Sequence, residues 1–349
     1  MTKIRVLIVE DSTVIRGLLE HIIATDTRLE VAGAAESGEQ ALHILSRLTP
    51  DVIAMDIGLP GIDGLETTRR IMSQMPVPIV VVTAGGAWKD SSAAVADAMR
   101  AGALTVLEKP SGTTSADYQF LSEKLCTQLV LMSEVKLVRR YREREVALRT
   151  PAVERRSRSS YWMLGIVCST GGPQALVTLL GGLGADFPVP IVIVQHMAAS
   201  FLEGFATWLE GVCPFPVVIA NDDTVPAPQT VYIAPADQHL SFSGGRLRLD
   251  SADPICAQRP SGNVLFRTMA RSLGRNALGV LLTGMGRDGA DGLYDIRRAG
   301  GHTIAQDEST CAVYGMPAAA VALGAACETL PLEAIAPRLV QLVPAKEAA

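Results

Sequence analysis

The chain has 349 residues, of which 48% are hydrophobic and 19% charged, and its formal net charge is −5. This length suits two domains of roughly 100–200 residues each, and the composition excludes a disordered protein. A net acidic chain has no global basic field to recruit nucleic acid, so we expect no nucleic-acid partner.

The cysteine pattern and the apolar stretches predict a soluble, cytoplasmic protein. The six cysteines form no CxxC pair and no Cys/His zinc spacing, which favours reduced thiols over a disulfide scaffold. The apolar run at the N-terminus contains charges and does not resemble a signal peptide. The uncharged stretch 309–327 contains Gly315, Pro317 and few large apolar side chains, which favours a buried loop and helix over a membrane span.

The first 110 residues alternate between two patterns. Short β-branched runs at 4–9, 31–35, 52–55, 79–82 and 104–107 are separated by segments of helical periodicity, such as 14–23 and 38–48. Buried runs that alternate with helices predict a doubly wound parallel α/β sheet. We expect a flavodoxin-like domain over residues 1–125.

The composition changes after this domain. Residues 126–160 are expected to form a helix and a linker, because positions 136–158 hold nine basic and three acidic residues, with Pro151 and a serine cluster nearby. Such a tract can bind nucleic acid or an anionic lipid surface, but a solvated linker is the simpler interpretation. Buried-strand candidates at 163–168, 190–195, 231–234 and 277–283 then predict a second, Rossmann-like α/β domain over residues 161–349.

Polar residues follow the strands of the first domain. Glu10 and Asp11 follow the first strand, Asp56 the third, Thr83 the fourth and Lys109 the fifth. In a parallel sheet these positions meet at one edge, where clustered carboxylates fit Mg²⁺. Asp56 can then act as nucleophile toward a phosphoryl donor, with Lys109 and Thr83 contacting the transferred group. The alternative is that each acid caps a following helix.

These residues closely resemble a response-regulator receiver domain over residues 1 to about 125. The resemblance is carried by VEDS (9–12), MDIGLPGIDG (55–64), Thr83 and Lys109-Pro110. It implies Mg²⁺ held by Glu10, Asp11 and Asp56, and phosphoryl transfer from a sensor histidine kinase to Asp56. Many receivers carry Tyr or Phe three residues before the lysine as a switch, whereas this chain has Val106.

A hydroxyl, an imidazole and a carboxylate follow strands of the second domain. Ser169 follows the strand at 163–168 and precedes two glycines, which suits a nucleophile, a phosphate-binding loop or a plain turn. His196 follows the next apolar run and is favoured as a base over His239 and His302 because it shares the strand-end position. Asp288 lies in a glycine-rich loop and can orient an imidazole through its Nδ1 proton, although Asp beside Gly is also a common turn.

The second half of the chain resembles the catalytic domain of the chemotaxis protein-glutamate methylesterase family. The segments that carry the resemblance are CSTGGP (168–173), VQHM (194–197), APADQHL (234–240), LTGMGRDGADG (282–292) and VYGMP (313–317). The resemblance implies Ser169 as nucleophile, His196 as base and Asp288 as the acid that orients it. It places Thr170 and Met285 beside the reacting carbonyl, with the Met285 backbone amide as an oxyanion donor.

The implied activity is hydrolysis of methyl esters on glutamate side chains of methyl-accepting chemotaxis receptors, and deamidation of receptor glutamines. Phosphorylation of Asp56 would activate it, no cofactor is expected in the catalytic domain, and the membrane would be met only through receptors. A DNA-binding response regulator is the first alternative, but the second half is long, strand-rich and lacks a basic recognition helix. The second alternative is a pseudoenzyme that binds receptors or kinases without turnover.

Overall fold

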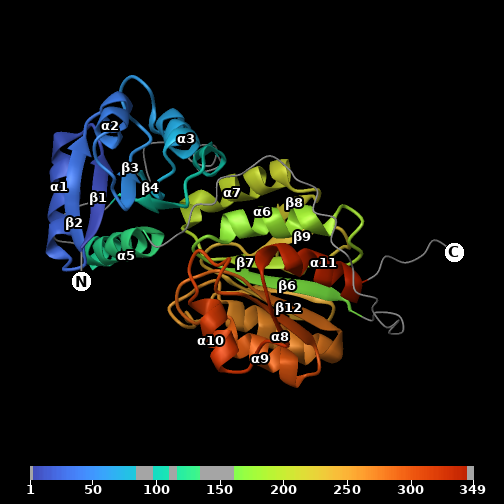
Figure 1. Ribbon diagram of the computed structural model, residues 1–349. Helices are drawn as coiled ribbons and strands as arrows, with labels where there is room; N and C mark the ends of the chain where they lie inside the picture. The colour runs from blue at the N-terminus through green and yellow to red at the C-terminus, as the bar shows by residue number, and fades with distance from the viewer. Residues whose placement is uncertain (1–2, 84–96, 110–115, 134–160, 344–349) are drawn as a thin grey trace.

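The computed structural model describes residues 3–83, 97–109, 116–133 and 161–343. These residues form two lobes, a smaller one from the N-terminal part of the chain and a larger one from residue 161 onward (Figure 1). Each lobe is built around a parallel β-sheet.

The smaller lobe contains a five-stranded parallel sheet with the order β2-β1-β3-β4-β5, which confirms the flavodoxin-like prediction. The strands are β1 (Ile4–Val9), β2 (Leu29–Ala35), β3 (Val52–Met55), β4 (Ile79–Thr83) and β5 (Thr105–Glu108). Four helices of this lobe are α1 (Thr13–Thr25), α2 (Gly38–Leu45), α3 (Gly64–Gln74) and α5 (Ala116–Ser133). The β-branched runs form these strands because a doubly wound sheet is covered by helices on both faces, which favours continuous apolar strands. Every residue of β3, for example, is buried.

The larger lobe contains a seven-stranded parallel sheet with the order β14-β13-β12-β6-β7-β9-β8, and a separate β10-β11 hairpin. The strands are β6 (Met163–Cys168), β7 (Ile191–Gln195), β8 (Val217–Ile219), β9 (Val231–Ile233), β10 (His239–Ser243), β11 (Arg246–Asp250), β12 (Ala277–Leu281), β13 (His302–Gln306) and β14 (Glu328–Leu330). The expected strands are all present. The sequence did not single out β8, β10, β11, β13 and β14, which are short or contain polar residues and lack a long apolar run.

Two helical layers cover the larger sheet. The helices α6 (Gly172–Leu183), α7 (Ala199–Val212) and α11 (Leu332–Leu342) pack on one face, and α8 (Gly262–Leu273), α9 (Ala290–Arg298) and α10 (Met316–Ala322) on the other. Side chains of β6 alternate between these layers, so Ile166 and Cys168 join the first core and Val167 joins the second. Cys168 is therefore fully buried, as predicted.

Helix α5 contributes to the core of the smaller lobe through Leu125, Cys126, Leu129 and Met132. The division of the chain at residue 125 remains a prediction, and this packing is our reason to propose that the first domain extends through α5. The basic segment 136–158 lies outside the described residues.

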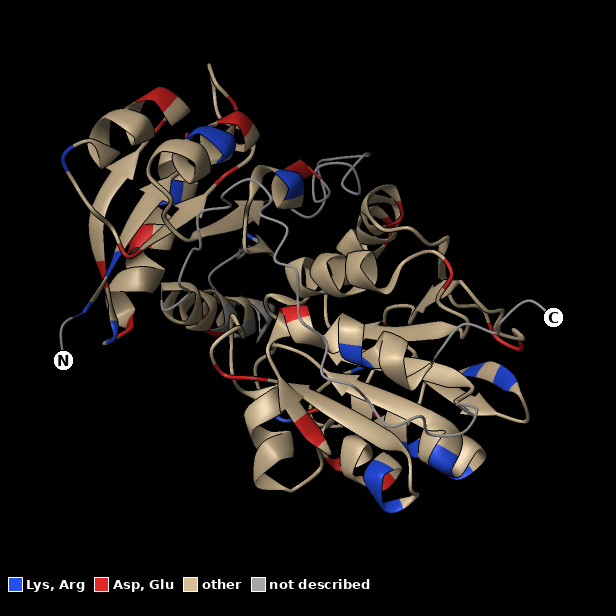
Figure 2. Ribbon diagram, turned by 45° about the vertical axis from the view of Figure 1, so that its right-hand side comes forward, with Lys and Arg blue, Asp and Glu red and all other residues tan. Residues whose placement is uncertain are grey.

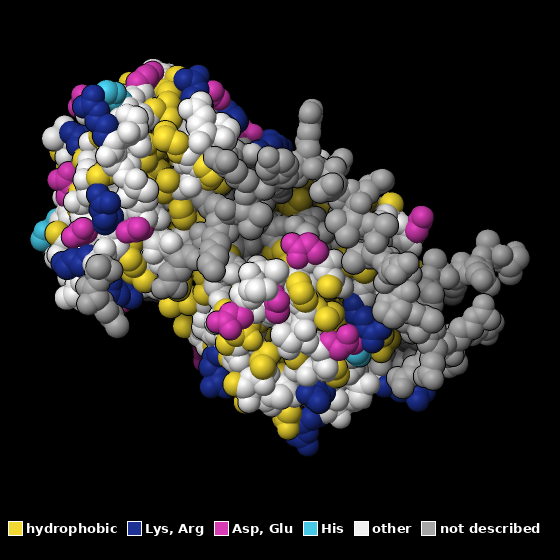
Figure 3. Space-filling model, in the orientation of Figure 1, with side chains coloured by type: hydrophobic (Ala, Val, Ile, Leu, Met, Phe, Trp, Pro, Cys, Tyr) yellow, Lys and Arg dark blue, Asp and Glu magenta, His cyan; other side chains and the backbone are white. Residues whose placement is uncertain are grey.

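Charged residues of both lobes lie mainly on helices and loops (Figure 2), and the central strands β6, β7 and β12 contain none. Basic and acidic side chains are interspersed on the face shown in Figure 3. Within the described part of the chain, no helix is both long and apolar enough to cross a bilayer. The uncharged stretch 309–327 instead contains the short helix α10.

Candidate active site

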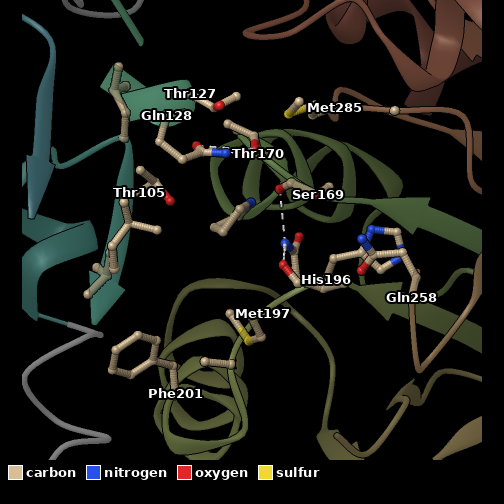
Figure 4. Close-up of a pocket in the computed structure, with 18 of the residues that line it drawn as sticks. Thr105, Thr127, Gln128, Ser169, Thr170, His196, Met197, Phe201, Gln258 and Met285 are labelled. Carbon is tan, nitrogen blue, oxygen red and sulfur yellow. Dashed lines mark hydrogen bonds between the residues drawn. The ribbon is translucent and has the colours of Figure 1, made fainter. Parts of the chain in front are cut away.

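A cavity of about 510 Å³ lies where the two lobes meet, and residues of both lobes line it. The smaller lobe contributes residues of β5 and α5, including Thr105, Thr127 and Gln128. The larger lobe contributes Ser169, Thr170, His196, Met197, Phe201, Gln258 and Met285 (Figure 4). Two of the three residues expected to carry the chemistry of the second domain, the serine and the histidine, therefore face the same space.

Ser169 lies at the carboxyl end of β6, immediately before the turn into α6. Its backbone N–H donates to the Thr283 carbonyl oxygen at 3.0 Å. The neighbouring loop approaches so closely that a Cβ atom on Gly284 would lie 2.8 Å from the Ser169 Cβ. The turn itself needs Gly171, whose φ is +77°. These glycines let the loop at Thr283 and Gly284 pack directly against the turn that carries the serine.

His196 follows β7, and its backbone is hydrogen-bonded to the residue that precedes the serine. The His196 N–H donates to the Cys168 carbonyl oxygen at 3.0 Å. The buried Gln195 side chain donates from Nε2 to the carbonyl oxygens of Ser169 at 2.9 Å and His196 at 3.1 Å. One amide group therefore holds the two strand ends in register.

Asp288 completes a pair with His196, but through a different ring nitrogen from the one expected. His196 Nε2 lies 3.0 Å from Asp288 Oδ2, so the prediction of a contact through Nδ1 is wrong. The rotation of the side chain turns Nε2 toward Asp288 in the glycine-rich loop. Among the described residues, Nδ1 is buried and has no hydrogen-bond partner, which leaves it available for a proton from another group.

The carboxylate of Asp288 is held by the N-terminus of α8. The Ser261 hydroxyl donates to Oδ1 at 2.6 Å and the Gly262 amide to Oδ2 at 2.6 Å, with the Asn263 amide 3.3 Å from Oδ1. Burial by itself would raise the pKa of Asp288. The His196 ring, the Ser261 hydroxyl and the Gly262 amide outweigh burial and hold that pKa below its ordinary value.

Sequence reasoning missed Gln195 and Ser261. Ser261 carries the usual signal of a helix N-cap, since it precedes a helical run and accepts from the Asn263 N–H at 3.2 Å. That signal would have predicted the start of α8, but nothing local indicates that the same hydroxyl binds a carboxylate 27 residues away.

The three other residues singled out beside Ser169 have separate environments. Thr170 is buried and exchanges hydrogen bonds with Gln128 of α5. Met285 lines the cavity and is half exposed. Burial raises the pKa of the Cys168 thiol far above its ordinary value, and the thiol donates to Gln195 Oε1 at 3.0 Å.

The two other histidines considered as bases lie elsewhere. His302 begins β13, so it lies at the amino ends of the strands, opposite the carboxyl ends that carry Ser169 and His196. Its Nε2 lies 2.8 Å from Glu328 Oε1. His239 begins β10 and is almost fully buried. Neither is among the described residues that line the cavity.

A second polar cluster lies at the carboxyl edge of the smaller sheet. Glu10, Asp11 and Asp56 can each offer one oxygen within a group whose atoms all lie within 4.8 Å of one another. Lys109 Nζ lies 2.8 Å from Glu10 Oε2 and 3.0 Å from Asp56 Oδ2. Thr83 ends β4, and its carbonyl oxygen accepts from the Lys109 N–H at 2.9 Å. The five predicted residues therefore converge.

This cluster fits a hard divalent cation such as Mg²⁺. Burial, followed by the Asp56 charge, raises the pKa of Glu10 despite the opposing Lys109 ammonium, and Glu10 Oε1 has no hydrogen-bond partner among the described residues. A bound cation would compensate this unpaired oxygen. The helix-cap alternative does not hold, because Ser12 caps α1 and Asp63 caps α3.

The fold and the two sites together define a response-regulator receiver domain joined to an α/β enzyme domain. The family model described as "Response regulator receiver domain" matches residues 6–116, and the model described as "CheB methylesterase" matches residues 164–339. The chain belongs to the CheB methylesterase family.

Curated relatives and a solved structure agree with this assignment. The chain is 53% identical over 341 residues to a Paramagnetospirillum magneticum protein named protein-glutamate methylesterase/protein-glutamine glutaminase 2, covering 97% of each chain. It is 43% identical to a Myxococcus xanthus relative named protein-glutamate methylesterase/protein-glutamine glutaminase 4, covering 96% of each. The crystal structure of the Thermotoga maritima CheB methylesterase catalytic domain is 36% identical with a TM-score of 0.51, and the match covers 52% of this chain and 99% of that one.

Proposed function

We propose that this chain is a phosphorylation-activated protein-glutamate methylesterase with protein-glutamine glutaminase activity, and that Ser169, His196 and Asp288 carry the reaction. The observation that carries the proposal is the 3.0 Å contact between His196 and Asp288 beside the cavity that Ser169 lines. An ionised carboxylate paired with an imidazole is the arrangement that activates a neighbouring hydroxyl.

In the first half-reaction, the Ser169 oxygen attacks the carbonyl carbon of a γ-glutamyl methyl ester. Its proton moves to His196 Nδ1, the ring nitrogen that is not committed to Asp288. Catalytic hydrogen bonds are often long before substrate binds and shorten in the complex. The Met285 backbone amide at the cavity is our candidate donor to the developing oxyanion.

The first half-reaction ends when the tetrahedral intermediate collapses: His196 gives the proton to the leaving methoxide, methanol departs, and the acyl-enzyme remains. In the second half-reaction, water attacks the acyl carbon while His196 accepts its proton. His196 then returns this proton to the Ser169 oxygen as the bond to the acyl carbon breaks, which releases a free glutamate side chain and restores the Ser169 hydroxyl. With a glutamine side chain the same steps release ammonia instead of methanol. Asp288 stays ionised throughout and stabilises the charged imidazole.

We propose that the substrates are glutamate and glutamine side chains of methyl-accepting chemotaxis receptors, as the family resemblance implies. The smaller lobe covers one side of the cavity through β5 and α5, so a bulky receptor helix would need the lobes to separate. Val106 packs against the cores of both lobes. An aliphatic side chain at this position supports release by loss of packing rather than by an aromatic switch.

We propose that Asp56 accepts a phosphoryl group from a sensor histidine kinase and that this weakens the contact between the lobes. Glu10, Asp11 and Asp56 would hold Mg²⁺, which would neutralise charge on the transferred group. Lys109 already contacts two of these carboxylates and would pair with the phosphoryl oxygens. A cytoplasmic location belongs to the same proposal.

Methanol release from methylated receptor membranes, with and without a small phosphodonor, tests the function directly. We expect the native chain to release methanol faster with phosphodonor, and Ser169→Ala to release none while still accepting phosphate. A native chain that binds these membranes without releasing methanol would instead be the non-catalytic binding protein considered above.

A further inference from the structure

His239 belongs to the APADQHL segment, yet the proposed reaction gives it no task. It begins β10, and only 1% of it is exposed. It is not among the described residues that line the catalytic cavity. A buried imidazole ring normally needs a hydrogen-bond partner at each nitrogen. The partners of the two ring nitrogens therefore indicate the role of His239.

The two partners of the His239 ring determine which nitrogen carries the proton. The Ser261 backbone N–H lies 3.1 Å from Nδ1 and can only donate, so Nδ1 is the unprotonated acceptor. The Asp253 carbonyl oxygen lies 3.1 Å from Nε2 and can only accept, so Nε2 carries the hydrogen. The environment therefore selects the neutral Nε2–H tautomer.

The residue held by His239 is the one that holds Asp288. Ser261 uses its backbone N–H for His239 and its hydroxyl for Asp288 Oδ1, at 2.6 Å. The next amide, from Gly262, donates to Asp288 Oδ2 at 2.6 Å. Both carboxylate oxygens thus depend on the N-cap and the first residue of the twelve-residue helix α8, whose N-terminus also favours a negative charge. The contact continues from Asp288 to His196 at 3.0 Å.

We propose that His239 is a positioning residue for the esterase reaction. As the neutral Nε2–H tautomer it fixes the Ser261 backbone, so that the α8 N-terminus orients Asp288 toward His196. The inference rests on the proposed function, since it assigns His239 a role through Asp288. A displacement of Asp288 by about an ångström would affect the rate rather than substrate binding, because positioning acts on the reacting geometry.

Two substitutions separate the two hydrogen bonds of the ring. In His239→Asn, the short amide can keep an oxygen acceptor near the Nδ1 position for the Ser261 N–H. In His239→Gln, the longer amide can keep an N–H donor near the Nε2 position for Asp253. Both variants lose the imidazole and one bond, so a purely structural role predicts equal losses of Tm and of kcat.

We expect kcat for methanol release to fall about tenfold in His239→Gln, on the scale of leaving a buried donor unpaired. In His239→Asn we expect kcat within about threefold of the native value, and in both variants an unchanged KM. The fall in kcat in the double variant Ser261→Ala/His239→Gln should be smaller than the product of the falls in the two single variants. Equal kcat in the Asn and Gln variants, or a change confined to KM, would overturn the positioning role.

One control variant and one spectroscopic measurement complete the test. His302→Gln removes a partly buried histidine at the amino ends of the strands, away from the catalytic cavity, and should lower Tm without lowering kcat. Nitrogen-15 NMR of the native full chain at neutral pH, with the His239 ring assigned through its bonds to the backbone, should show an unprotonated Nδ1 and a protonated Nε2. The opposite tautomer or a charged ring would overturn the proposal even if the variants fail to fold.

Asp288→Asn distinguishes failure of this inference from failure of the proposed function. If Asp288→Asn keeps the native kcat, the catalytic assignment fails and the role of His239 fails with it. If Asp288→Asn is inactive while His239→Gln keeps the native kcat, the function stands and only the positioning role is overturned.

Discussion

The Gln128 side chain on α5 and the Thr170 hydroxyl on the larger lobe exchange hydrogen bonds. Gln128 Nε2 donates to Thr170 Oγ1 at 3.2 Å, and the Thr170 hydroxyl donates to Gln128 Oε1 at 3.4 Å. Thr170 directly follows Ser169, so the smaller lobe contacts the chain beside the proposed nucleophile. A second contact, from Gln174 Nε2 to the Met99 carbonyl oxygen at 3.3 Å, supports the same interface.

Gln128→Ala should raise the basal esterase activity, because it removes a buried contact that keeps the lobes together. One neutral hydrogen bond stabilises by about 0.5–1.5 kcal/mol, so the increase should be roughly two- to tenfold. Methanol release without phosphodonor measures it. Gln119→Ala, at an exposed position on the same helix, is the matched control and should leave basal activity unchanged. A Gln128→Ala enzyme with native basal activity would argue against this contact as a restraint.

Asp56→Asn should keep the basal esterase activity and abolish its stimulation by a small phosphodonor. The substitution removes the carboxylate oxygen that would attack phosphorus but leaves the catalytic cavity intact, since Asp56 lies in the other lobe. Esterase assays with and without phosphodonor measure both quantities. Stimulation that persists in Asp56→Asn would mean that another group accepts the phosphoryl.

Millimolar Mg²⁺ should raise the Tm of the smaller domain in the native chain, because a cation that binds only the folded state stabilises it. At about 100 times its Kd, such a ligand contributes about 2.7 kcal/mol. Asp11→Asn removes one of the three clustered carboxylates and should reduce the Tm increase. Asp63→Asn keeps a residue that caps α3 and should respond like the native chain. Equal responses in both variants would place the cation elsewhere.

Cys168→Ala should keep kcat within about threefold of the native value, because burial keeps the thiol protonated and a neutral thiol is a poor nucleophile. Its weak contact with Gln195 makes a small loss of stability the main expected effect. Iodoacetamide followed by mass spectrometry should label the exposed Cys327 and spare Cys168. A loss of activity as complete as that of Ser169→Ala would reopen the choice of nucleophile.

The stability of the larger domain should fall in acid partly through Asp288. Because its folded-state pKa is lowered, the stabilisation from its ionised form is fully present above about pH 4, the unfolded value, and is lost as the pH falls through the folded pKa. Urea unfolding at pH 6 and below pH 4 should therefore show a smaller pH effect in Asp288→Asn than in the native chain. Asp186→Asn, at an exposed position in the same domain, should keep the native pH effect.

The sequence predicted both parallel sheets and the residues at their carboxyl edges. Periodicity identified the buried strands. In a parallel sheet the carboxyl ends of all strands lie along one edge, so polar residues that follow the strands come close together there. That rule predicts Asp56 beside Lys109, and Ser169 beside His196, from the sequence alone. It worked because strand direction and burial are properties of short segments, which local sequence encodes.

The tertiary structure alone decided the contacts that depend on side-chain rotation and on segments far apart in the chain. It placed Nε2 rather than Nδ1 of His196 against Asp288, 92 residues away, and joined Ser261 to the same carboxylate. It also set Gln128 against Thr170, across the boundary between the lobes. The periodicity of the sequence does not encode such pairs. They form when helices and strands pack together and each buried polar group must find a hydrogen-bond partner.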